Sequence, residues 1–543
     1  MLRWNGETEA FSPRHEASTI ELFFDLFFVA NLATFTDYHA ITNWDNFGSY
    51  IAFFAILWVS WFQITTFDVR FAADSVWERG CKVVHCLYFI SIMLVGYKAE
   101  PSFVDPKIPD WVHQTLCFAM LINRAWLGIQ YLVTTIYSTR PGHHPKDVVL
   151  PLAIQSGLFF LTGGVYGALA GTFHDRKGDI AGFYSAIYLT LTIELMATLG
   201  ISMRWRKLSF RATHLNERLG LLGIIIIGEG VIGLTKTIIN TMGRTGPDYL
   251  YYALIFCNVL ILLFMWQLYY DNLPRYRFGT IKQQLWAALH FPMHLAILGV
   301  AEGTRQIILA YFAVEHEDLV LGDVTNACNT EHLDGTALSE RLSKTIKSLK
   351  LDSSCPGRES LPFIYDQIAL LGNSTGVCSA ANITNPDNVA PGLGGVPRAF
   401  VDYISRATGG VVQSLNIEYI PEAEASGLAQ SMSARKVVYN YYWGAILLLL
   451  ACLTASALLA KEGHRLARMR TVSVVVRSGV VMTVAMLLML GNLWKEFLRQ
   501  FNGSPWVLPT VVFMFWVVAL GDRYSKGRLQ KKREEQAAGA ASS

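Results

Sequence analysis

Long apolar segments alternate with short polar connections along most of this 543-residue chain. A helix needs about 20 mainly apolar residues to cross a bilayer, and twelve segments meet or approach that length. The third is short and the ninth contains Pro292, so these two fit the criterion least well. The pattern predicts an all-α integral membrane protein with about twelve transmembrane helices. Their ranges are 20–38, 47–67, 83–97, 112–137, 148–173, 180–201, 219–239, 249–270, 285–312, 438–460, 472–493 and 505–520.

The same pattern divides the chain into five regions. Residues 1–19 form a polar N-terminus without the apolar core of a cleavable signal peptide. Residues 20–312 hold helices one to nine, and 438–520 hold helices ten to twelve. Between them lies a polar insert, 313–437. The basic and then small-residue tail, 521–543, has the composition of a disordered segment that attracts anionic lipid.

Composition agrees with a membrane location. Hydrophobic residues make up 52% of the chain and charged residues 16%, whereas soluble domains have about 25% charged residues. The net charge of +3 is too small to indicate a nucleic-acid partner, so membrane lipids are the expected partner. The sequence contains no phosphate-cradling loop, which argues against ATP coupling, and no cofactor is predicted.

The distribution of Lys and Arg predicts the orientation, because cytoplasmic loops are enriched in both. If the N-terminus is cytoplasmic, the inner connections and the tail carry most of these residues and the outer connections carry few. Both termini are therefore predicted to be cytoplasmic. The inner connections would hold Arg70, Arg79, Lys82, Arg140, Lys146, Arg204, Arg206, Lys207, Arg211, Arg218, Arg275, Arg277, Lys282, Lys461, Arg465, Arg468, Arg470 and Arg477.

The insert falls on the outer side under this orientation. It contains the glycosylation sequons at Asn373 and Asn382, and the sequon at Asn502 is outside as well. This placement predicts a glycoprotein of the secretory pathway, in the plasma membrane or an endomembrane of a eukaryote. Within the insert, 338–349 is predicted to be helical, and the Pro- and Gly-rich stretch around 392–395 is predicted to be a loop.

Three cysteines lie in the insert: Cys328, Cys355 and Cys378. A disulfide can form on the outer side. The odd number leaves one of them unpaired, and the sequence does not tell which two would pair.

The first apolar segment carries two carboxylates. Glu21 and Asp25 are four residues apart, so they lie on one helical face, roughly 6 Å apart along the axis. An acid inside a membrane segment indicates a functional site. The alternative is that both stabilise the helix N-terminus near the headgroups, which suits Glu21 better than Asp25.

The seventh segment starts at Glu217 and places Glu229 twelve residues further on, roughly 18 Å into the bilayer. Several glycines around it allow another helix to approach closely. Glu229 is therefore expected to face protein or a cavity, either as an ion-binding group or as a polar contact that holds two helices together.

Arg124 lies at the centre of the fourth segment and requires an anion. Glu229, Asp25 and Glu194 are the acids at similar depth. A structural ion pair is the alternative to a role in ion binding.

In the ninth segment, His290 and His294 are four residues apart on one face. This spacing suits a proton relay or a metal site. The alternative is that each only forms a hydrogen bond between helices.

Polar landmarks recur about 200 residues apart, which predicts a parallel repeat of six plus six helices, as in some transporters. The alternative is chance combined with similar lipid interfaces. The paired landmarks are Glu21 with Glu217, Asp68 with Asp271, and His85 with His290.

These motifs together resemble the bacterial low-temperature-requirement A family. The resemblance rests on Glu-Leu-Phe-Phe-Asp-Leu at 21–26, on Glu217-Arg218 followed by Gly228-Glu229, on Trp266 to Asp271, and on His290. It covers segments one to nine well and ten to twelve loosely. Two features depart from the family: Gly230 stands where the family usually has Ser, and the outer insert is extra. The resemblance implies a multi-pass membrane fold and no particular activity.

The residues favour a secondary-transporter-like protein or a proton or ion pathway, and not an enzyme, with a site around Asp25, Arg124, Glu194, Glu229, His290 and His294. Buried carboxylates and histidines can bind and release protons. The full set of candidate transport or ion-binding residues is Glu21, Asp25, Arg124, Glu194, Glu217, Glu229, Asp271, His290 and His294.

Two other functions fit the same residues. An intramembrane metal-dependent hydrolase would use His85, His290 and His294 as ligands. A membrane scaffold or stress-response protein would need no turnover and would tolerate the loss of Asp25 or Glu229. Substrate, direction of transport and oligomeric state do not follow from the sequence.

Overall fold

The structure is a computed structural model in which most of the chain is described. The described residues are 4–5, 10–11, 17–38, 41, 43–72, 75–98, 108–139, 148–172, 180–208, 210, 213–242, 249–273, 280–379, 382–383, 388–390, 396–415, 427–459 and 464–541. Most of the polar N-terminus over 1–19 and the predicted loop around 392–395 lie outside these residues.

The prediction of twelve membrane-spanning helices is confirmed. Within the described residues, twelve helices are long and apolar enough to cross a bilayer, and each corresponds to one predicted segment. They are α1 (Thr19–Tyr38), α2 (Trp44–Phe71), α3 (Val76–Lys98), α4 (Asp110–Ser138), α5 (Val149–Thr172), α6 (Ile180–Arg204), α7 (Leu215–Met242), α8 (Tyr249–Asp271), α9 (Thr280–Thr325), α14 (Gly427–Leu459), α15 (His464–Leu493) and α17 (Val507–Ala541).

Two helices run further than their apolar segments. Helix α9 continues through Pro292 to Thr325, because neighbouring groups can compensate for the one backbone donor that a proline removes. Helix α17 continues through the basic tail to Ala541, so the expectation of a disordered tail is wrong. Ala, Lys, Arg, Glu and Gln dominate the tail, and these are the strongest helix formers.

Helix α2 lies at the centre of the bundle. From Ile56 to Phe71 its residues are buried on every face, and it contacts α1, α4, α6, α7 and α9. A helix surrounded by protein on all sides can hold polar groups at membrane depth because none of its faces meets lipid.

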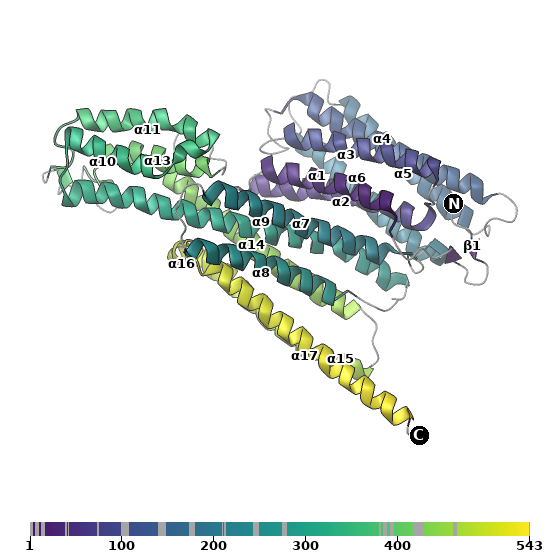
Figure 1. The fold of residues 1–543 in the computed structure, drawn as a ribbon. Helices are drawn as coiled ribbons and strands as arrows, with labels where there is room; N and C mark the ends of the chain where they lie inside the picture. The colour runs from purple at the N-terminus through teal and green to yellow at the C-terminus, as the bar shows by residue number, and fades with distance from the viewer. Residues whose placement is uncertain are drawn as a thin grey trace.

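The second half of the bundle is arranged along α9. Helix α14 packs along α9, and α15 and α17 form a pair that contacts the bundle through α14 and α8 (Figure 1). Gly299 and Gly303 of α9 face Ala445 and Tyr442 of α14 so closely that a Cβ added to either glycine would collide with its neighbour. This is the small-x-x-x-small packing of membrane helices.

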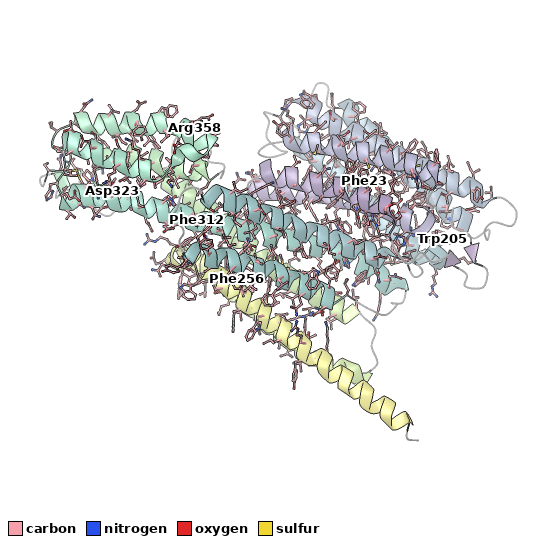
Figure 2. All side chains as sticks on the ribbon, in the orientation of Figure 1. Phe23, Trp205, Phe256, Phe312, Asp323 and Arg358 are labelled. Carbon is pink, nitrogen blue, oxygen red and sulfur yellow. A yellow bond between two sulfur atoms is a disulfide. The ribbon has the colours of Figure 1, made fainter. Side chains whose placement is uncertain are left out.

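A small helical bundle sits at one end of the molecule, where α9 leaves the membrane helices (Figure 1). Figure 2 labels Phe312 near the point where α9 leaves the main bundle and Asp323 on the extension of α9. The prediction of a helix over 338–349 is confirmed by α10. Further elements are α10 (Gly335–Ser348), α11 (Cys355–Asn373), α13 (Val401–Ser414), the short α16 (Lys495–Asn502) and an antiparallel pair of two-residue strands, β1 (Trp4–Asn5) and β2 (Ala10–Phe11).

A disulfide joins Cys328 to Cys378 in this small bundle, and Cys355 is free and exposed. The bond ties the end of α9 to the segment after α11. Asp323 reinforces the same region, since it accepts hydrogen bonds from Arg341 at 2.8 Å and from Thr345 at 2.5 Å. The insert is therefore a folded unit built onto α9.

Exposed tryptophans mark both ends of the bundle, as expected at membrane interfaces. Three of them lie at helix starts that the charge pattern places outside, and each is about half exposed or more: Trp44, Trp111 and Trp506. Trp77 lies at a helix start that the charge pattern places inside. Both termini lie at the end away from the small bundle (Figure 1). That the termini face the cytoplasm remains a prediction.

Several basic residues assigned to inner loops are buried inside the bundle, which corrects that assignment. Lys82 pairs with Asp68, Arg218 with Asp25, and Arg477 with Asp522. Each of these cations neutralises one acid. The positive charge that orients the protein is thus smaller than the count of Lys and Arg indicates.

Candidate functional site

A narrow recess opens between α1, α7 and α9. About 340 Å³ of empty space lies within and in front of it, and the enclosed part has room for about one water molecule. It lies toward the ends of α1 and α7 that are predicted to be outside. Its lining combines two carboxylates, two cations and a hydroxyl with small apolar residues. The lining residues are Thr36, Glu229, Gly230, Gly233, Lys236, Leu298, Ala301, Glu302 and Arg305.

Glu229 occupies the inner wall of the recess and is 5% exposed. The Thr36 hydroxyl lies 3.1 Å from Oε1 of Glu229 and 3.0 Å from the carbonyl oxygen of Ala33. A hydroxyl carries a single proton, so it cannot donate fully to both oxygens. A protonated Glu229 would donate to Thr36 while Thr36 donates to Ala33. The geometry thus accommodates both the neutral and the ionised carboxyl group.

The second carboxylate of the recess, Glu302, is held by its own helix. Arg305 donates to it from Nε at 3.0 Å and from Nη2 at 2.5 Å, and Gln306 donates to it at 2.9 Å. Paired donors of this kind hold a carboxylate in a fixed position. Glu302 and Arg305 therefore form a fixed, neutral pair beside Glu229.

Two tyrosine hydroxyls lie next to this pair. Tyr50 of α2 is within electrostatic range of Glu302, Glu229 and Arg305, and Tyr441 of α14 is within range of Glu302 and Arg305. Both hydroxyls are buried and have no hydrogen-bond partner in the described part of the chain. Buried donors without partners cost about 1–3 kcal/mol each.

Asp25 lies outside the recess, in a closed cluster near the other end of α1. Arg218 donates to its two oxygens at 2.7 and 2.8 Å, and Trp61 donates to it at 2.8 Å. All three side chains are completely buried. The arrangement joins α1, α2 and α7 and leaves no room for an ion between the charges, so it favours a structural role for Asp25.

The two other acids near this end of α1, Glu21 and Glu217, also have polar contacts. His214 lies 3.4 Å from Glu21, which additionally accepts from the backbone of Ser18 at 2.8 Å. Glu217 is exposed and accepts a long hydrogen bond of 3.4 Å from the backbone of Ala17. The hydrogen bond from the Ser18 backbone to Glu21 agrees with the interpretation that Glu21 stabilises the N-terminus of this helix.

Arg124 pairs with Glu194, one of the three acids that the sequence places at a similar depth. Its Nε donates to Glu194 at 2.9 Å, and its Nη atoms lie 3.2 and 3.3 Å from Ser60. All three side chains are completely buried. The expected site that would combine Arg124 with Glu229 is therefore not formed.

His290 and His294 lie side by side, with ring centroids 5.3 Å apart. Trp58 donates to Nδ1 of His294 at 3.2 Å, so the proton of this ring is on Nε2, 3.4 Å from the Tyr269 oxygen. Tyr269 in turn donates to the carbonyl of Leu219 at 3.0 Å. This complete chain of donors fixes His294 as a neutral, structural residue.

His290 donates from Nδ1 to the carbonyl of Trp286 at 2.9 Å. His85 contacts α4 with both ring nitrogens, at 2.9 Å from Asn123 and 3.0 Å from Gln130. Among the described residues, no group of three His, Cys, Asp or Glu side chains could hold a metal ion. The three-histidine site of a metal-dependent hydrolase is thus not formed.

The landmarks of the predicted repeat differ in their surroundings. Asp68 is buried against Lys82, whereas Asp271 is 44% exposed and lies 3.8 Å from Lys526. Packing is more alike, because α1 lies against α3 as α7 lies against α9. The six-plus-six repeat remains a prediction, and Asp271 is not part of a buried site.

The three sequons also differ. Asn373 is exposed at the end of α11, and Asn382 is partly buried. Asn502 is 2% exposed, and its amide nitrogen donates to the carbonyl of Arg435 at 3.2 Å. A glycan would have to replace that hydrogen bond.

Sequence reasoning identified Glu229 but not Thr36, Tyr50 or Tyr441, and it did not group Glu302 and Arg305 with Glu229. Tyr50 and Tyr441 begin apolar segments, where tyrosines commonly mark the membrane interface, so nothing distinguished them. Thr36 is one of many threonines. The spacing of Glu302 and Arg305, three residues apart on one face, was the available signal for an ion pair beside the recess.

A family model described as bacterial low temperature requirement A protein (LtrA) matches residues 16–329, more than half of the chain. The match begins before α1 and ends just after α9, so it contains every residue lining the recess. No curated protein and no solved structure matches the chain.

Proposed function

Because the chain belongs to the bacterial low temperature requirement A family, we propose that its multi-pass bundle supports a secondary-transporter-like activity or a proton pathway, with Glu229 as the exchanging group. The family does not assign an activity, so the proposal rests on the recess. The observation that carries it is the Thr36 hydroxyl placed between Glu229 and the Ala33 carbonyl, which suits a carboxyl group that gains and loses a proton.

The surroundings of Glu229 support this role better than those of the other acids. Asp25 and Glu194 each face an arginine inside the closed bundle, and releasing either acid would leave a buried cation unpaired. Glu229 instead lines a recess, where a water molecule can reach it. A carboxyl group exchanges protons only where they can enter and leave.

The test is proton flux into vesicles that contain the purified protein. Glu229→Gln keeps the size and hydrogen bonding of the side chain and removes its titration. We expect the variant to fold and to lose pH-driven flux measured with an enclosed pH-sensitive dye. Glu217→Gln makes the same chemical change at an exposed position of the same helix, and its flux should equal that of the wild type. Undiminished flux in Glu229→Gln would reject the proposal and favour a scaffold.

We further propose that the protein is a glycoprotein of a plasma membrane or endomembrane. The exposed sequon at Asn373 and the disulfide Cys328–Cys378 lie together in the small bundle, and both modifications form on the outer side of such membranes.

A further inference from the structure

We propose that His214 and Glu21 form a pH-sensitive ion pair, which joins the start of α1 to the start of α7 while His214 carries a proton. This inference goes beyond the function proposed for Glu229 and does not depend on it. It concerns the ends of α1 and α7 that are predicted to be cytoplasmic, opposite the recess.

The two side chains meet where α1 and α7 begin. Nε2 of His214 lies 3.4 Å from Oε2 of Glu21, and the two residues are 5% and 1% exposed. Each stands four residues before a member of the Asp25–Arg218 pair, so the contact lies about one helical turn closer to the cytoplasmic end. The helices α1 and α7 are thus in polar contact at two successive levels.

The backbone holds both side chains in place. The carbonyl of His214 accepts a hydrogen bond from the backbone of Arg218 at 3.1 Å, which fixes His214 at the start of α7. Oε2 of Glu21 accepts from the backbone of Ser18 at 2.8 Å, and the backbone of Ala17 donates to Glu217 at 3.4 Å. The chain that enters α1 therefore already contacts the first turn of α7, and His214 reaches Glu21 without a rearrangement.

The surroundings of the His214 ring suit a group that takes up a proton. Neither ring nitrogen has a hydrogen-bond partner among the described residues. A neutral imidazole has one N–H donor, whereas the protonated ring has two. A proton on His214 turns the 3.4 Å contact into a pair of opposite charges inside the protein, where the attraction is stronger than in water. Arg218 stays charged at every physiological pH, so the Asp25–Arg218 pair is permanent and the Glu21–His214 pair is conditional.

The other charged groups near the contact are paired with each other or exposed. Those within the described residues are Asp68 of α2 with Lys82 of α3, Arg218 of α7 with Asp25 of α1, and the exposed Glu217 of α7. Asp68 and Arg218 both interact electrostatically with Glu21, and their opposite charges oppose each other. Glu21 is the acid within ion-pair distance of His214 in the described part of the chain.

The direction of the pH dependence follows from the charge of the ring. Histidine changes its charge between about pH 5 and 8. The folded protein gains the ion pair only while His214 is protonated, so the stabilisation is present at acidic pH and is lost as the pH rises. Acidification at the cytoplasmic end would therefore hold α1 more firmly against α7. The same two helices contribute Thr36 and Glu229 to the recess, so the pair links the packing of the recess walls to cytoplasmic pH.

A double-mutant cycle in the purified full-length protein tests the pair. Melting temperatures in detergent are compared for the wild type, Glu21→Gln, His214→Gln and the double variant, at about pH 5.5 and about pH 8. At acidic pH, each single substitution should lower the melting temperature, and the double variant should melt no lower than the less stable single variant. At alkaline pH, this non-additivity should disappear because His214 is neutral. Other titrating groups are common to all four proteins, so their effects cancel. Additive effects at both pH values, or equal non-additivity at both, would overturn the inference.

Hydrogen exchange gives a second measurement that does not require any variant of the pair to fold. In the wild type, the amides of residues 17–24 should be better protected at acidic than at alkaline pH, after correction for the intrinsic pH dependence of exchange. His316→Gln is the matched control, because His316 is a partly buried histidine whose Nδ1 contacts the carbonyl of Phe312 on its own helix. This control should keep the pH dependence of residues 17–24. Equal protection at both pH values in the wild type, or loss of the dependence in His316→Gln, would contradict the proposed pair.

Discussion

Thr36 and Glu229 lie 193 residues apart in the chain, and Asp25 and Arg218 have the same separation. The two contacts therefore share one register between α1 and α7. Helices that keep a constant offset over about three helical turns run parallel and without stagger. The buried ion pair fixes one end of this helix pair, and the recess lies toward the other end.

Breaking the ion pair at the closed end should destabilise the protein without changing the chemistry of the recess. Asp25→Asn leaves Arg218 buried without a counter-charge, which costs about 3–5 kcal/mol. We expect a lower melting temperature in detergent, and partial recovery in Asp25→Asn with Arg218→Gln. Glu496→Gln breaks an exposed pair with Arg499 and should change stability by no more than about 1 kcal/mol. A fully stable Asp25→Asn variant would contradict the structural role.

The Arg124–Glu194 pair allows a sharper test, because the sequence allowed three acids as the partner of Arg124 and Glu194 was one of them. Arg124→Gln should lower thermal stability and expression because Glu194 is then buried and unpaired. Adding Glu194→Gln should restore both properties, whereas adding Glu229→Gln should not. Rescue by Glu229→Gln instead would mean that the two residues interact.

The sequence was sufficient to predict the twelve helices, because hydropathy and length alone determine which segments can span a bilayer. It could not predict the pairings. Lys82 and Arg218 are at the edges of their apolar segments. At such a position the local sequence is the same whether the cation lies in a loop or folds back to contact a buried acid. Their partners, Asp68 and Asp25, come from other helices. Contacts between distant segments are set by packing, which leaves no periodic pattern in one sequence.

The candidate site shows the same limit. Glu229 was predicted because a mid-membrane carboxylate is conspicuous on its own. The grouping of Glu229 with Asp25, Arg124 and the two histidines was wrong, since each of the others is engaged elsewhere. Depth along a helix is readable from sequence, whereas the direction in which a side chain points across the bundle depends on its neighbours.

Burial separates the three sequons experimentally. In a eukaryotic expression host, Asn373→Gln should increase gel mobility to the same extent as removing one glycan, since Asn373 is exposed. Asn502→Gln should leave mobility unchanged, because Asn502 is buried and bonded to the backbone of Arg435. Electrophoresis with and without glycosidase measures both. A mobility shift in Asn502→Gln would show that this region opens during synthesis, and unmodified Asn373 would argue against an outer location of the insert.

The two glycines that flank Glu229 should respond differently to the same small change. A Cβ on Gly230 would lie 2.8 Å from Leu262 and 2.9 Å from Ala301, whereas a Cβ on Gly228 meets nothing within 4 Å. Because Gly230 lines the recess, Gly230→Ala must push α7 away from α8 and α9, at a cost of about 1–3 kcal/mol. We expect a lower melting temperature and reduced pH-driven flux, with Gly228→Ala close to the wild type in both. Adding Ala301→Gly should recover part of the loss, since it removes one of the two contacts. Identical behaviour of the two alanine variants would mean that α7 does not pack this closely in the membrane, and the recess would then have a different lining.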